Sequence, residues 1–245
     1  MASVTDVSRA EDGGTNHAHA PLPPLTNGDH LTQAEFLRRY SAMPDLHNAE
    51  LVEGVVYTPS PVTHKHHGAP HFALITWLGL YQVHTPGIEG GDNSTLRLDD
   101  RNAPQPDSFL VILPTHGGQV RFDADGYIIG APELVAEVAA TSAAIDLNAK
   151  KTAYLRNGVR EYIVWRVFDR TIDWFVARDG RFDRLSPGEG GRLESRVLPG
   201  LWLDPDALIG GDRMSVDRVA RQGIATPEHA AFVARLHEHA AKAQS

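Results

Sequence analysis

The sequence predicts a mixed α/β fold, in which helices flank a central sheet of parallel and antiparallel strands. Short runs rich in Val, Ile and Leu alternate with segments whose apolar residues recur at helical spacing. Several strand runs are joined by tight turns, which is typical of hairpins and argues against an all-parallel sheet. The length of 245 residues is enough to bury one sizeable core.

The N-terminal part is expected to contain an arm, a short helix and a strand pair. Residues 1–30 are rich in Gly and Pro and lack apolar periodicity, which predicts a disordered arm. A helix over 33–43 should follow, with Thr32 as its N-cap. Apolar residues on both sides of Gly54 predict a strand pair or one bent strand.

The central part is expected to alternate between helix and strand. Apolar residues at helical spacing predict a helix over 70–83 with one buried face. Strands are expected over 95–98 and 107–113. The segment 119–129, with Asp125-Gly126 near its centre, predicts a hairpin inserted between core elements.

The next segments complete the predicted sheet. A strand over 133–138 precedes a helix over 144–157, which Gly158 should close. Strand runs over 161–167 and 171–177 should form a hairpin, and a further short strand is expected after it.

The elements group into one principal domain with extensions at both ends. We expect this domain to cover residues 31–210, after the arm over 1–30. Residues 211–245 carry two helical patterns and are expected to form a C-terminal helical extension.

Composition excludes several classes of protein. The chain has no cysteine, so disulfides, thiolate nucleophiles and zinc–thiolate sites are excluded. No apolar stretch approaches the roughly 20 residues that span a bilayer, and no hydrophobic signal core is evident, so the expected location is the cytoplasm. A net charge of −8 argues against a protein that coats nucleic acid non-specifically, yet it allows an enzyme with a locally basic groove.

Two carboxylates lie in apolar strand segments. Asp107 follows Pro106 and opens one predicted strand, and Glu137 lies near the end of another. A carboxylate buried in a strand is costly unless it is paired or binds a cation, and two neighbouring carboxylates repel each other. Mg²⁺ would relieve both costs, because it binds one or two carboxylates together with water and phosphate oxygens. The alternative for each acid is a solvated strand end or a turn cap.

Lys150 is the candidate cationic residue. Asp146, Lys150 and Tyr154 are spaced by four, so they share one face of the predicted helix. If that face turns towards the strand ends, Lys150 can stabilise negative charge on a reacting phosphate. The alternatives are a surface helix with an Asp146–Lys150 pair, or Lys151 in the same role.

Short motifs in a fixed order resemble a known family. They run from the N-terminal strand pair to the strand after Gly158, and comprise Glu50-Leu51-Val52-Glu53-Gly54, Ser60-Pro61, Pro106-Asp107, Glu133-Leu134-Val135-Ala136-Glu137-Val138, Asp146…Lys150…Tyr154 and Gly158-Val159-Arg160-Glu161-Tyr162. In this order the chain, over roughly residues 31–208, resembles the Uma family of restriction endonucleases, within the PD-(D/E)XK nuclease superfamily.

The resemblance implies a restriction-endonuclease-like core with flanking helices and a site at one edge of the sheet. Asp107 and Glu137 would be metal ligands, Glu50 a further acidic member, and Lys150 the catalytic lysine. The superfamily pattern places that lysine two residues after the second acid, where this chain has Ala139. The family resemblance places it instead on the following helix.

The histidine-rich segment offers a separate hypothesis. His67 and His71 would share a helical face and could bind a transition metal, but no obvious third ligand accompanies them. We favour a polar loop that leads into a helix, with one histidine near the nuclease site. A weaker hypothesis is a zinc hydrolase built around His66 and His67.

The favoured function is therefore a Mg²⁺-dependent endonuclease acting on DNA, with Mn²⁺ as an alternative cofactor. Its expected partner is DNA, no membrane partner is expected, and a homodimer would explain cleavage of both strands most simply. The alternative is a non-catalytic binding or scaffold module that keeps the nuclease fold, an alternative motivated by Ala139 and the net negative charge.

Overall fold

The computed structural model describes residues 22–58 and 60–243. Most of the predicted arm, residues 1–21, lies outside the described residues. None of the described helices is both long and apolar enough to cross a membrane.

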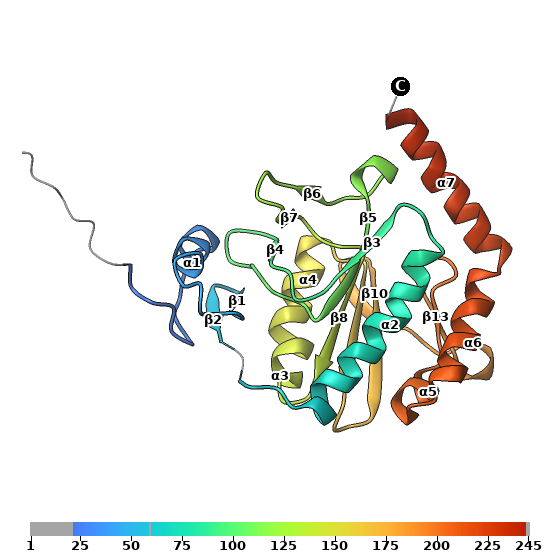
Figure 1. Cartoon of the computed structure of the whole chain (residues 1–245), viewed down its shortest axis with the longest axis horizontal. Helices are drawn as coiled ribbons and strands as arrows, with labels where there is room; N and C mark the ends of the chain where they lie inside the picture. Colours follow the sequence, from blue (N-terminus) through green and yellow to red (C-terminus); the bar gives the residue numbers. More distant parts are fainter. Residues whose placement is uncertain (1–21, 59, 244–245) are drawn as a thin grey trace, which may run out of the picture.

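A central sheet of six strands organises the chain (Figure 1). Its spatial order is β11-β10-β9-β8-β5-β3. The pairing of β8 with β9 is parallel, and the other four pairings are antiparallel. The strands are β3 (Ile88–Gly91), β5 (Ser108–Ile112), β8 (Leu134–Ala139), β9 (Glu161–Arg166), β10 (Thr171–Arg178) and β11 (Arg181–Arg184). The prediction of a mixed sheet with flanking helices is confirmed.

The two faces of the sheet bury different residues, because alternate side chains of a strand point to opposite faces. In β8, Leu134, Ala136 and Val138 enter one apolar cluster, whereas Val135 and Ala139 enter the other. Glu137 has the same parity as Val135, so it belongs to the second face. We call the first face the leucine–tryptophan face and the second the tyrosine face.

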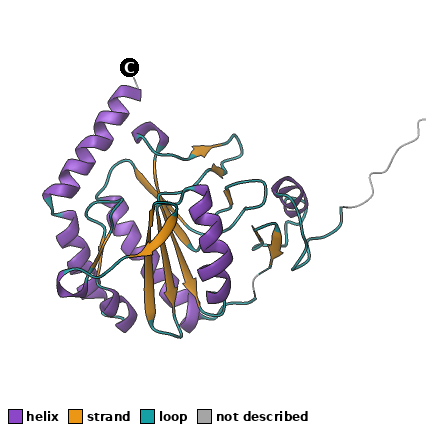
Figure 2. Cartoon of the chain, turned by 180° about the vertical axis from the view of Figure 1, so that it is seen from behind, coloured by secondary structure: helices purple, strands orange, loops and turns teal. Residues whose placement is uncertain are grey.

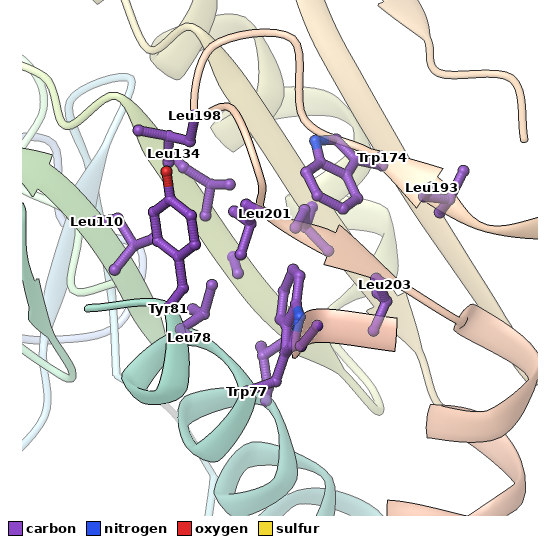
Figure 3. Close-up of a cluster of buried hydrophobic side chains, with 14 of the residues drawn as sticks. Trp77, Leu78, Tyr81, Leu110, Leu134, Trp174, Leu193, Leu198, Leu201 and Leu203 are labelled. Carbon is purple, nitrogen blue, oxygen red and sulfur yellow. The ribbon is translucent and has the colours of Figure 1, made fainter. Parts of the chain in front are cut away.

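The leucine–tryptophan face is covered by α2 (Ala69–Val83) and three C-terminal helices (Figure 2). Trp77 and Tyr81 of α2 meet Trp174 of β10 and a set of leucines (Figure 3). The C-terminal helices are α5 (Pro205–Gly210), α6 (Arg213–Ile224) and α7 (Pro227–Ala243).

The predicted C-terminal extension shares this core. Val216 and Ala220 of α6 and Phe232 and Leu236 of α7 are buried in the same cluster as Trp77. The predicted boundary at residue 210 therefore does not separate an independent packing unit.

The tyrosine face is covered by a helical run that matches the prediction over 144–157. It consists of α3 (Ala143–Ile145), a π-helical turn η3 (Asp146–Lys150) and α4 (Lys151–Asn157). Gly158 ends it in the left-handed conformation, with φ of 95°, which favours glycine.

The N-terminal elements lie on the same side as α3 and α4 (Figure 1). They are α1 (Gln33–Tyr40), capped by the Thr32 side chain as predicted, and the hairpin of β1 (Glu50–Val52) and β2 (Val55–Tyr57). Leu25 is buried with them, and the Gly28 N–H donates to Val56 O at 2.8 Å. Residues 25–30 are therefore ordered, and the prediction of disorder is wrong for them.

Smaller elements complete the fold. A three-stranded sheet contains the predicted 119–129 hairpin, as β6 (Arg121–Phe122) and β7 (Ile128–Ile129), next to β4 (Leu96–Arg97). The remaining elements are η1 (His64–Gly68), η2 (Pro114–His116), η4 (Glu189–Gly191), β12 (Leu193–Glu194) and β13 (Trp202–Leu203). The edge strand β3 escaped prediction because its two glycines weaken the strand pattern.

Candidate active site

Two strands bring Asp107 and Glu137 together on the tyrosine face. Asp107 directly precedes β5, and Glu137 lies in β8, its antiparallel neighbour. The amide nitrogen of Asp107 lies 3.4 Å from Glu137 Oε2. Both side chains are largely buried, with 13% of Asp107 and 4% of Glu137 exposed. The solvated alternative for these acids is therefore wrong.

Lys150 points inward from the helical run onto these acids. Its Nζ lies 3.0 Å from Glu137 Oε1 and 3.7 Å from Asp146 Oδ1. The alternative of a surface helix is wrong, because the Lys150 side chain is only 8% exposed. Lys151 points elsewhere, with its Nζ 3.5 Å from the centre of the Phe175 ring.

Glu50 reaches the same ammonium from the N-terminal hairpin. Its two carboxylate oxygens lie 2.9 and 3.0 Å from Lys150 Nζ. One of these oxygens also accepts the Gln105 N–H at 2.9 Å, which links β1 to the segment before β5. The Lys150 ammonium therefore binds both Glu50 and Glu137. These three residues are predicted from three separate motifs.

Tyr154 extends the predicted helical face by one turn. Its hydroxyl donates to Glu137 Oε1 at 2.9 Å, so this oxygen receives both a phenol and an ammonium. The face shared by Asp146, Lys150 and Tyr154 turns towards the strands, as the spacing predicts.

Two histidines contact Asp107 from the other side. His67 Nε2 lies 3.0 Å from Asp107 Oδ1, and His71 Nε2 lies 2.6 Å from the Asp107 carbonyl oxygen. The second carboxylate oxygen of Asp107 accepts the Val138 N–H at 2.6 Å. The favoured interpretation places one histidine near the site at the end of a polar loop, whereas the structure places two there and folds residues 64–68 into a π-helical turn.

His66 does not share this position. Its ring packs against Phe168 with the centroids 4.9 Å apart, and its Nδ1 lies 3.3 Å from Thr63 Oγ1. Adjacent residues of the π-helical turn η1 point in different directions, so His66 and His67 are not brought to a common partner. The spacing of four between His67 and His71 is the sequence feature that distinguishes His67 from His66.

Burial and charge act against each other in this cluster. Burial raises the pKa of Glu137 well above its usual range, although Lys150 opposes the shift. Burial also raises the pKa of Asp146. Burial would lower the pKa of Lys150, but the carboxylates of Glu137, Glu50 and Asp146 hold it well above its usual value. Lys150 is therefore an ammonium.

Asp107 shows the opposite balance. Burial alone would raise the pKa of Asp107, but the His67 hydrogen bond and charge and the Val138 N–H hold this pKa below its usual value. The same hydrogen bond raises the pKa of His67. Asp107 is thus an ionised carboxylate.

The donor set suits a hard divalent cation. In the described ranges, no group of three or more His, Asp or Glu side chains is arranged as a metal-binding site. Mg²⁺ needs only one or two carboxylates, with water and substrate completing its shell. Asp107 and Glu137 could supply them, and a cation would offset the surplus of carboxylates over the single Lys150 ammonium. The buried Asp146 Oδ1, which has no hydrogen-bond partner, is a further sign of this surplus.

Comparison with known proteins identifies the family. No curated protein matches the chain. Among solved structures, the chain is similar to a crystal structure from Anabaena variabilis ATCC 29413, described as "a putative nuclease belonging to DUF820", with 13% sequence identity and a TM-score of 0.49. That match covers 61% of this chain and 83% of the other. The sequence profile of the Uma2 family, described as "Putative restriction endonuclease", matches residues 33–206, more than half of the chain. The chain therefore belongs to the Uma2 family.

Proposed function

We propose that this protein is a metal-dependent endonuclease that hydrolyses phosphodiester bonds in DNA, with Mg²⁺ as its cofactor and Mn²⁺ as a substitute. The observation that carries the proposal is the position of the Lys150 ammonium, 2.9 Å from Glu50 and 3.0 Å from Glu137, whose other carboxylate oxygen lies 3.4 Å from the Asp107 amide nitrogen. Membership of the Uma2 family supports the same class of reaction.

Each residue of the cluster has a role in this proposal. Asp107 and Glu137 hold the divalent cation, and His67 and the Val138 N–H fix the Asp107 carboxylate. Lys150 stabilises the negative charge that grows on the phosphate oxygens as the bond breaks. Glu50 keeps the Lys150 ammonium in place.

A bound divalent cation would supply Lewis acidity at the phosphate and would lower the pKa of the attacking water. The chain itself supplies orientation. The carboxylates that bind Lys150 come from β1 and β8, so the ammonium is held from two separate elements.

The absence of a lysine two residues after Glu137, where the superfamily pattern expects one, does not weaken this proposal. Ala139 is buried, whereas Lys150 reaches the Glu137 carboxylate from the helical run that follows β8. A lysine on this helix can therefore replace one on the strand.

Plasmid cleavage with Mg²⁺ or Mn²⁺ tests the proposal. We expect Asp107→Ala and Glu137→Ala each to lower the cleavage rate by about a hundredfold to a thousandfold, since removal of single catalytic groups costs on this order. Glu133→Gln is the matched control, because Glu133 is buried beside the start of β8 and its carboxylate accepts the Ile112 N–H outside the cluster. Cleavage as rapid in Asp107→Ala as in the wild type would exclude this active site.

Calorimetry separates the enzyme from a non-catalytic module. An enzyme of this kind should bind Mn²⁺, and Glu137→Ala should abolish the binding. Absence of Mg²⁺ and Mn²⁺ binding in the wild type would favour a scaffold that keeps the nuclease fold.

Cleavage of both strands further predicts a homodimer, which light scattering on the purified protein measures.

A further inference from the structure

Asp146 is a buried carboxylate with an incomplete set of partners. The residue is only 1% exposed. Its Oδ2 accepts the Ser142 hydroxyl at 2.6 Å, whereas its Oδ1 has no hydrogen-bond partner. A buried acceptor without a donor is costly, and here an ammonium lies close to the unpartnered oxygen.

The nearest candidate donor is Lys150. Its Nζ lies 3.7 Å from Asp146 Oδ1, beyond the range of a hydrogen bond, and is held instead by Glu50 and Glu137. A shift of about 1 Å would bring the ammonium into hydrogen-bond range of Asp146. Lysine has a flexible stem and three donors, so a small movement of this kind is accessible to it.

The turn η3 places the two residues at its opposite ends. Asp146 begins this π-helical turn and Lys150 ends it. Single π-helical turns are rare and often occur at functional sites. The Ser142 hydroxyl holds the carboxylate at one end, so the movable partner is the lysine.

A divalent cation at Glu137 would create a need for such a second anchor. The cation and the Lys150 ammonium would both be positive, and both would use the Glu137 carboxylate. Two positive charges that share one carboxylate in a buried site repel each other strongly. The lysine would then keep only Glu50 as a close partner, and Asp146 is the other carboxylate within its reach.

We propose that Asp146 is a positioning residue, which receives the Lys150 ammonium when a divalent cation takes the Glu137 carboxylate. This inference rests on the proposed function, because it assumes a cation at Glu137. It assigns the unpartnered oxygen of Asp146 to the cation-bound state of the site.

Titration calorimetry of Mn²⁺ into the full-length protein tests the inference with a double-mutant cycle. We expect Asp146→Asn to weaken Mn²⁺ binding by about tenfold, because the displaced lysine loses its acceptor. Lys150→Met should tighten binding, since the competing ammonium is gone. In the Lys150→Met background, Asp146→Asn should change the affinity by no more than about twofold.

Ser142→Ala provides a milder variant in case Asp146→Asn folds poorly. It removes the bond that orients the carboxylate, so we expect a smaller loss of affinity, which Lys150→Met should again cancel. Equal weakening by Asp146→Asn with and without Lys150 would overturn the inference, because Asp146 would then act on the cation directly. No effect of either variant would also overturn it. Absence of Mn²⁺ binding in the wild type would instead remove the proposed metal site itself.

Discussion

Two buried glutamates on neighbouring strands, Glu137 of β8 and Glu161 of β9, show how the two faces of the sheet differ. Glu137 is 3% exposed and Glu161 is 0% exposed. The carboxylate of Glu161 accepts the Ser195 hydroxyl at 2.7 Å, the Arg196 N–H at 2.6 Å and the Trp174 indole N–H at 3.2 Å. These donors are neutral and belong to the leucine–tryptophan face.

Glu137 is surrounded by charge instead. Its side chain meets the Lys150 ammonium and the Tyr154 hydroxyl, and the carboxylates of Glu50 and Asp146 share the same ammonium. Burial raises the pKa of both glutamates, to about 7 for Glu161. We infer from this comparison that Glu161 stabilises the fold, whereas Glu137 serves the proposed function.

The largest effect on stability should come from Glu161→Gln. The change places an amide NH₂ group opposite donors that need an acceptor, so we expect a loss of about 3 kcal/mol in the free energy of unfolding. Urea denaturation measures it, and cleavage by the folded protein should be unchanged. A cleavage defect at full folding would break the comparison, because Glu161 would then share a role with Glu137.

Two buried tyrosines sharpen the comparison in a second way. Tyr154 donates to Glu137, whereas Tyr81 donates to the Pro199 carbonyl on the opposite face at 3.0 Å. Tyr154→Phe and Tyr81→Phe should each lower the free energy of unfolding by about 1 kcal/mol. Only Tyr154→Phe should also slow cleavage, by about tenfold, because it removes a partner of the carboxylate that we propose as a metal ligand. Equal cleavage rates in the two variants would limit Tyr154 to a structural role.

The last expected effect on stability is also small and has the opposite sign. Glu137→Gln removes one negative charge from a crowded cluster, so we expect the metal-free protein to gain about 1 kcal/mol in the free energy of unfolding. Thermal denaturation in a chelator measures this gain, with Glu161→Gln as the reference that loses stability. A loss of stability in Glu137→Gln would indicate that Lys150 already balances the cluster without a cation.

Local patterns in the sequence predicted much of the fold. Apolar runs placed β5, β8, β9 and β10, and helical spacing placed α2 and the helical run before Gly158. The elements that escaped prediction are short or rich in glycine, as in β3, or consist of two residues, as in β12 and β13. Such segments carry too few side chains to show a period.

The sequence by itself determined which side chains share a face of a strand or a helix. The period of two in a strand puts Glu137 on the same face as Val135, and the spacing of four puts Asp146, Lys150 and Tyr154 on one side of a helix. The family motifs added Glu50 and favoured Lys150 as the lysine.

Only the tertiary structure decided which faces meet. It selected Lys150 over Lys151, brought Glu50 to a lysine 100 residues away, and separated His67 from His66. The tertiary structure also revealed that a buried carboxylate oxygen of Asp146 has no hydrogen-bond partner. The physical reason is that periodicity fixes the direction of a side chain relative to its own backbone, whereas contacts across the sheet depend on how distant elements pack.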